Sequence, residues 1–141
     1  MKTWAKNVIV INVMQDSIFT NIIRGEIPSH KIYEDEKTFA FLDIFPETPG
    51  HTLIVPKIQV DKFYDLPDED YIALFSTAKK IAKHMEEVLG QRIFLKIIGT
   101  DVPHVHIHLL PEDPNYVRQV PEPKRADDID LEKMSEKIRL D

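Results

Sequence analysis

The alternation of histidine and apolar residues from His104 to Leu110 restricts the fold more than any other feature of this chain. Side chains of a β-strand point alternately to opposite faces, so a strand here places His104, His106 and His108 on one face and their apolar neighbours on the other. Successive imidazoles then stand about 6.6 Å apart. Because the apolar side fits beneath a helix, the segment predicts a sheet whose second face presents a row of titratable rings.

Packing alone explains such a row poorly, because buried ring nitrogens need partners and protonated rings repel one another. Two chemical interpretations fit the spacing equally well. In the first, an H-x-H pair binds a metal ion with further ligands, for which His51 is the obvious candidate and Asp101 or Asp113 are weaker ones. In the second, His106 is a nucleophile toward phosphorus or an acyl carbon, and its neighbours fix its tautomer and share protons.

The region from Ser17 to Leu110 predicts an α+β domain. Ser17 suits the N-cap of a short helix that stops at Gly25, and the apolar spacing from Asp68 to Leu89 is that of one long helix, which Gly90 ends. Five β-rich runs predict strands at 31–34, 38–43, 52–55, 92–98 and 102–110. The connections within the first and last pairs are too short for a parallel crossover, so we expect an antiparallel five-stranded sheet covered by the long helix and the short N-terminal one.

Three parts of the chain differ in composition. Residues 1–16 form an N-terminal extension, residues 17–111 form the domain, and residues 112–141 form a polar tail with a helix over 127–140. Leu131, Met134 and Ile138 share one side of that helix. The longest apolar stretch without a charge, 7–15, is less than half of the ~20 residues that span a bilayer, and we interpret it as a strand rather than a signal peptide.

Charge and cysteine content limit the partners. With 18 Lys and Arg against 24 Asp and Glu, the net charge of −6 gives no long-range attraction to nucleic acid or to an anionic membrane surface. The chain has no cysteine, which excludes a disulfide framework, a thiolate metal site and a cysteine nucleophile. We expect a cytoplasmic protein that binds neither nucleic acid nor membrane.

Several ordered blocks of sequence resemble the histidine triad (HIT) superfamily, whose signature alternates three histidines with apolar residues as 104–110 does. The other blocks begin at Ser17 (Ser-Ile-Phe-Thr-Asn-Ile-Ile-Arg-Gly-Glu-Ile-Pro), at Ala40 (Ala-Phe-Leu-Asp-Ile) and at Pro49 (Pro-Gly-His-Thr-Leu-Ile-Val-Pro-Lys). The likeness to the Hint-like branch implies a homodimer that hydrolyses purine nucleoside phosphoramidates or other nucleotidyl esters through a nucleotidyl-histidine intermediate. It implies no cofactor and no catalytic metal, which favours the nucleophile.

The resemblance also implies roles for individual residues. His106 matches the nucleophile, His104 and His108 match its flanking partners, and His51 matches the histidine that completes the cluster. Asp43 matches the carboxylate that accepts both ribose hydroxyls, a task that suits an anionic acceptor. The apolar slot for the base corresponds to Ile18, Phe19, Ile22, Phe41, Leu42 and Ile44.

The chain departs from the family pattern at three places. Ser17-Ile18-Phe19-Thr20 replaces a Cys-x-x-Cys of many bacterial relatives, so we expect their structural zinc to be absent. The connection 98–102 before the triad is shorter and lacks the Asn and Gly-Gln of relatives, which leaves Thr100 or backbone N–H groups to contact the phosphate. Gln59 stands where relatives have a histidine.

Two further expectations follow. The three triad rings should project together into an open, nucleotide-sized cleft, and the long helix and the strand at 92–98 should form the dimer interface. Because the phosphate connection is short, a nucleotide-binding or regulatory protein with little catalysis is the alternative to an enzyme.

Overall fold

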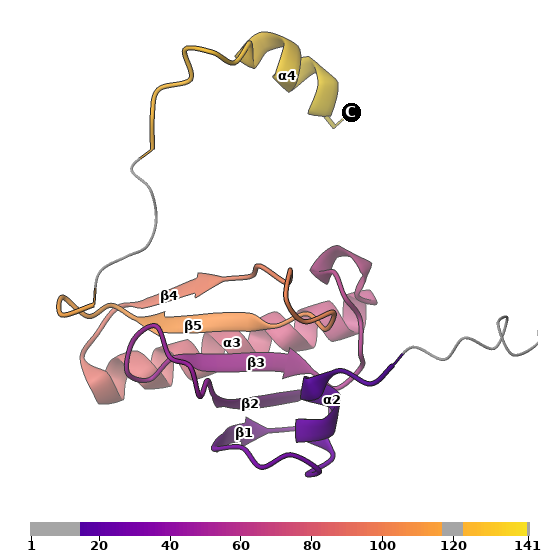
Figure 1. Ribbon diagram of the computed structural model, residues 1–141, viewed down its shortest axis with the longest axis vertical. Coiled ribbons are helices and arrows are strands. Elements are labelled where there is room, and N and C mark those ends of the chain that lie inside the picture. The colour runs from indigo at the N-terminus through magenta and orange to yellow at the C-terminus, as the bar shows by residue number, and fades with distance from the viewer. Residues whose placement is uncertain (1–14, 117–122, 141) are drawn as a thin grey trace, which may run out of the picture.

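The computed structural model describes residues 15–116 and 123–140, and it contains a five-stranded antiparallel sheet with one long helix behind it (Figure 1). The strand order is β1-β2-β3-β5-β4, and neighbouring strands all pair antiparallel. The α+β fold expected from the sequence is therefore confirmed. The elements are α2 (Ile18–Ile23), β1 (Lys31–Glu34), β2 (Thr38–Leu42), β3 (Thr52–Pro56), a 3-10 turn (Phe63–Asp65), α3 (Asp68–Leu89), β4 (Ile93–Lys96), β5 (Ile107–Pro111) and α4 (Leu131–Ile138).

The helix α3 has the bounds that its periodicity predicts. Three acidic residues occupy its first turn, where they favour the helix dipole, and Gly90 ends it in the left-handed conformation at φ 68°. Its buried stripe packs on one face of the sheet and forms the larger core with Ile54, Ile107 and Leu109. Burial of one such side chain contributes about 1.5–3 kcal/mol, so this face supplies much of the stability.

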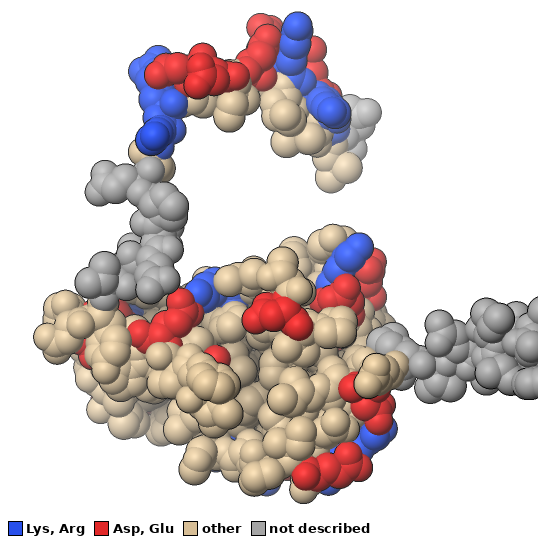
Figure 2. Space-filling view, viewed as in Figure 1, with Lys and Arg blue, Asp and Glu red and all other residues tan. Residues whose placement is uncertain are grey.

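The opposite face of the sheet carries a second apolar cluster and the short helix α2. In the strand register, Phe39 lies opposite Val55 and Phe41 lies opposite Leu53, and all four side chains are buried with Phe19 of α2. Figure 2 looks onto this face and shows few Lys or Arg side chains across it. We call it the open face, because α3 lies on the other side.

The last strand is shorter than predicted. Ladder pairing begins at Ile107, whereas the sequence predicts a strand from Val102. Pro56 closes β3 and has no N–H to donate, so the segment before Ile107 bonds elsewhere, and the Val105 N–H donates to the Val60 carbonyl at 2.7 Å. Alternation of the side chains nevertheless persists, because Val105 joins the core beneath α3.

The termini add little to this description. The predicted strand near residues 7–15 lies almost wholly outside the described residues. The tail helix α4 is confirmed with narrower bounds, Leu131–Ile138, and its three apolar side chains are exposed. Within the described ranges, no helix has the length and apolar character needed to cross a membrane.

Candidate active site

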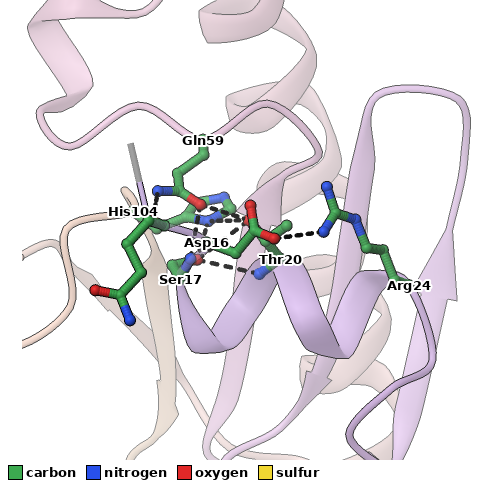
Figure 3. Close-up of polar contacts among 7 residues, drawn as sticks. Asp16, Ser17, Thr20, Arg24, Gln59 and His104 are labelled. Carbon is green, nitrogen blue, oxygen red and sulfur yellow. Dashed lines mark hydrogen bonds and ion pairs between the residues drawn. The ribbon is translucent and has the colours of Figure 1, made fainter. Parts of the chain in front are cut away.

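His104 is completely buried, and both of its ring nitrogens are hydrogen-bonded. Figure 3 shows the ring beside Ser17. Its Nε2 lies 2.8 Å from the carbonyl oxygen of Pro56. Since a carbonyl only accepts, Nε2 carries the proton, and Nδ1 accepts from the Ser17 hydroxyl at 2.7 Å. His104 is therefore a neutral structural ring, and the expectation that all three triad rings project into an open cleft is wrong for this residue.

The ring of His106 is held in one tautomer by the backbone. Its Nδ1 lies 2.8 Å from the carbonyl oxygen of His104, so Nδ1 carries the proton and Nε2 keeps its lone pair. The ring packs on Phe19 at 4.9 Å between centroids and is only 3% exposed. Among the described residues, the only fully buried side-chain polar atom without a hydrogen-bond partner is Thr48 Oγ1. Nε2 of His106 is therefore not fully buried, and a small part of it is accessible from the surface.

His51 and His108 form a directly bonded pair. The Glu47 N–H donates to Nδ1 of His51 at 3.1 Å, which places the proton of His51 on Nε2. That Nε2–H donates to Nδ1 of His108 at 2.8 Å, so neutral His108 carries its own proton on Nε2. The centroids of the His106 and His108 rings lie 4.8 Å apart, so the two rings are neighbours.

Burial disfavours the protonated forms of His108, His51 and His104. It lowers the pKa of His108 to about 4, with further lowering from the charges of His106, His51 and Lys96 and partial opposition from Asp43. Burial also lowers the pKa of His51 and of His104. In His104, the hydrogen bond to Pro56 opposes the shift without cancelling it.

Asp43 lies directly beside the histidine pair. Its Oδ1 accepts from the Phe45 N–H at 2.9 Å, and its Oδ2 lies 3.6 Å from Nε2 of His51, too far for a hydrogen bond. One donor atom from each of Asp43, His51 and His108 lies within 4.8 Å of the others, so these three could hold a metal ion. Such an ion would have to displace the proton that already joins the two rings.

Only some of the six residues expected to form the apolar slot for the base lie together in the structure. Phe19, Ile22 and Phe41 are buried in one cluster, while Ile18 and Ile44 are exposed. Leu42 lies opposite Thr52 and shares the α3 face with Ala40 and Ile54, so the structure does not place it in the slot. Leu53 is in the cluster instead, and its place opposite Phe41 follows from the β2–β3 register, which alternation along a single strand does not give.

Thr100 is exposed in the β4–β5 connection, and its hydroxyl lies 3.5 Å from a carboxylate oxygen of Asp101. No contact joins it to a triad histidine among the described residues. The structure therefore does not bring Thr100 to the site.

Lys96 is a cation at the site that the sequence does not single out. It lies opposite His108 in the β4–β5 ladder, on the same face, and cross-strand neighbours have Cβ atoms about 4.5–5.5 Å apart. Its Nζ contacts a carboxylate oxygen of Glu47 at 2.6 Å, and this contact lowers the pKa of Glu47. A cavity of about 760 Å³ is lined by Lys96 and Glu47 together with residues that include Thr48, Phe94 and Leu110.

The residues at the positions of the relatives' cysteines do not fit zinc. Ser17 and Thr20 offer hydroxyl oxygens and Gln59 offers an amide, whereas zinc in proteins takes Cys, His or carboxylate ligands. The nearby Nδ1 of His104 could bind a metal, but it already accepts a hydrogen bond from the Ser17 hydroxyl. These side chains form a hydrogen-bonded cluster instead (Figure 3).

The depressed pKa of His108 makes stability pH-dependent. Between pH 4 and the usual value of 6.5, the unfolded chain binds a proton at this position that the folded chain does not, so the free energy of unfolding falls as pH is lowered through that range. Urea unfolding should show a shallower fall for His108→Gln than for the unsubstituted protein, with the exposed His30→Gln as the control. Equal slopes in all three proteins would contradict this assignment.

Comparison with known proteins agrees with the geometry. The HIT domain family matches residues 24–115. Adenosine 5'-monophosphoramidase HNT1 of Saccharomyces cerevisiae is 43% identical over 99 residues, which are 67% of this chain and 61% of that protein. Two solved structures also match. A HIT family protein from Bacillus subtilis gives a TM-score of 0.78 at 35% identity, and the match covers 90% of this chain and 99% of that chain. A histidine triad nucleotide-binding protein from Candida albicans gives a TM-score of 0.70 at 34% identity, and the match covers 86% of this chain and 94% of that chain. The chain belongs to the HIT family.

Proposed function

We propose that this protein hydrolyses nucleoside phosphoramidates or related nucleotidyl esters, with purine nucleosides preferred, through a nucleotide transiently bonded to His106. The observation that carries the proposal is the 2.8 Å hydrogen bond from His106 Nδ1 to the His104 carbonyl. It leaves the lone pair of Nε2 available on the face that also holds His108. The relatives whose names state phosphoramidase activity and nucleotide binding support the same substrate class.

In the first step, Nε2 of His106 attacks the α-phosphorus, a bond from phosphorus to Nε2 forms, and the bond to the amine breaks with its electron pair on the amine nitrogen. The amine leaves readily only if it gains a proton, a contribution worth about 10²- to 10⁴-fold in rate. The neighbouring ring of His108 can supply that proton from its Nε2–H when the His51–His108 pair holds one extra proton. The negative charge of the bound phosphate favours that state and opposes the effect of burial.

In the second step, water attacks the phosphorus and the bond to His106 breaks. The water gives one proton back to the His51–His108 pair, and the nucleoside monophosphate leaves. The ring keeps its Nδ1 proton and is therefore positively charged while it carries the nucleotide, so it departs as neutral imidazole, which is a good leaving group.

The two ends of the substrate meet different surroundings. At the nucleoside end, Oδ2 of Asp43 can accept ribose hydroxyls, and the cluster around Phe19 and Phe41 offers apolar surface to the base. At the phosphate end, Lys96 supplies positive charge beside His108, which the short β4–β5 connection does not otherwise provide.

His106→Ala removes the attacking nitrogen. Turnover of an adenosine phosphoramidate, followed by release of the amine with EDTA present, should fall by at least about 1,000-fold while adenosine binding persists. His30→Ala, which alters an exposed histidine, should match the unsubstituted rate. Turnover by His106→Ala near that rate would reject the nucleophile, and binding without turnover in the unsubstituted protein would favour the regulatory alternative. Loss of all activity on chelation would favour a metal at Asp43, His51 and His108.

Asp43→Ala and Lys96→Met should separate nucleoside from phosphate recognition in calorimetry. Loss of the Asp43 carboxylate should weaken adenosine and AMP alike, by about 10- to 100-fold, because charge-assisted hydrogen bonds contribute about 1.5–3 kcal/mol. Loss of the half-exposed Lys96 should weaken AMP by only a few-fold and leave adenosine unchanged. Each variant is the control for the other, and a Lys96→Met protein with unaltered AMP affinity would remove Lys96 from the site.

We also propose that the protein forms a homodimer through the β4 edge of the sheet. The strand β4 is an edge strand, and Leu95, Ile98 and Val88 near it are exposed by 48%, 56% and 66%. Edge strands and exposed apolar side chains are commonly covered in soluble proteins. The HIT-family resemblance implies a homodimer, and the interface at β4 and the long helix is our own expectation.

Sedimentation velocity at micromolar concentration should give a dimer. Leu95→Asp on β4 should shift it to monomer, because a charge placed in the interface would lose water without gaining a partner. Ile32→Asp on the opposite edge strand, β1, should remain dimeric. A monomeric unsubstituted protein would refute the dimer, and dissociation by Ile32→Asp rather than Leu95→Asp would place the interface at the other edge.

A further inference from the structure

Gln59 binds the chain segment before α2 through every polar atom of its side chain. Its Oε1 accepts from the Ser17 N–H at 2.7 Å and from the Thr20 hydroxyl at 2.7 Å. Its Nε2 donates to the Gln15 carbonyl at 2.8 Å. Because the amide thus bonds the backbone of residues 15 and 17 on one side, it holds the start of α2 against the segment that follows β3 (Figure 3).

The same contacts extend to the first triad histidine. The Ser17 hydroxyl donates to Nδ1 of His104 at 2.7 Å and accepts from the Thr20 N–H at 3.1 Å. Ser17 is 6% exposed and His104 is fully buried, so water does not compete for these bonds. We call Ser17, Thr20 and Gln59 the anchor cluster, since Ser17 donates to Nδ1 of His104 and the other two residues hold Ser17 in place.

His104 passes this constraint to His106 through its main chain. The carbonyl oxygen of His104 is the sole acceptor for Nδ1 of His106 among the described residues. A displacement of the main chain at His104 would move that carbonyl and release the His106 ring, whose Nε2 would then no longer be the fixed unprotonated nitrogen.

We propose that the anchor cluster positions the nucleophile: Ser17, Thr20 and Gln59 hold His104, and the His104 carbonyl keeps Nε2 of His106 unprotonated and directed at the substrate. These are positioning residues, because none of them needs to touch the substrate. The proposal rests on the proposed function for its kinetic consequence, but the tautomer that it assigns to His106 holds independently of any reaction.

Gln59→Met tests the proposal, since methionine matches glutamine in length and has no amide. In protein labelled with ¹⁵N at histidine, the ring spectrum of the unsubstituted chain should show His106 as the Nδ1–H tautomer and His104 as the Nε2–H tautomer. In Gln59→Met, His106 should become a mixture of tautomers, and kcat should fall about ten- to hundred-fold, the usual cost of a misplaced reacting group. Adenosine affinity should stay within two-fold, whereas simple loosening of α2, which carries Phe19, would weaken it.

Two further variants sharpen the comparison. Gln59→Glu keeps an acceptor oxygen for Ser17 and Thr20 and should fall between the unsubstituted protein and Gln59→Met. Gln91→Met is the matched control, because Gln91 also donates its Nε2–H to a backbone carbonyl, that of Glu112, but at the far end of the sheet. It should change neither kcat nor the ring spectrum.

A folded Gln59→Met protein with an unchanged His106 tautomer and unchanged kcat would overturn the proposal. If Gln59→Met does not fold, Thr20→Val, which removes one hydroxyl from the cluster, decides by the same two measurements. If the unsubstituted protein turns over no nucleotide substrate, the proposed function fails, and the ring spectra alone still decide whether the cluster sets the His106 tautomer.

Discussion

The burial of His104 as a neutral ring with two hydrogen-bonded nitrogens is the constraint on which the site depends. An unpaired polar atom in the interior costs about 1–3 kcal/mol, so a fully buried imidazole is stable here only with a donor on one nitrogen and an acceptor on the other. Ser17 and the Pro56 carbonyl supply these. The orientation that results leaves the backbone carbonyl of His104 in place to bind the next histidine.

Three histidines that look equivalent in sequence thus become chemically different. His104 serves the structure, His106 presents an unprotonated Nε2, and His108 presents a protonated one because His51 donates to its other nitrogen. Each difference comes from one hydrogen bond to a backbone carbonyl, a hydroxyl or another ring. Burial adds to this order by lowering the pKa of His108 to about 4.

Residue spacing predicts much of this fold, but not the partners that complete the site. The apolar period of 68–89 and its glycine stop define α3 completely, since local pattern and tertiary packing agree there. The strand at 102–110 is only half right, because its first residues do not pair with a neighbouring strand. The Val105 N–H donates to the Val60 carbonyl, and the His104 N–H donates to the Val102 carbonyl. The base slot that the resemblance implies includes Leu42, whereas strand alternation places this residue on the other face of the sheet.

The contacts of Lys96 and Gln59 show why the sequence does not predict the rest of the site. Lys96 meets His108 only through the β4–β5 register, and Gln59 meets Ser17 across 42 residues of chain. Neither contact leaves a local pattern. Both become visible once the sheet order and the path of the segment after β3 are known.

The central claim is that His106 forms a bond to phosphorus during turnover, and mass spectrometry of protein quenched in the act of hydrolysing an adenosine phosphoramidate tests it most directly. The account predicts a protein heavier by one adenosine monophosphate moiety, with the added mass on the peptide that contains His106. Turnover with no such adduct, or an adduct located on His51 or His108, would contradict it.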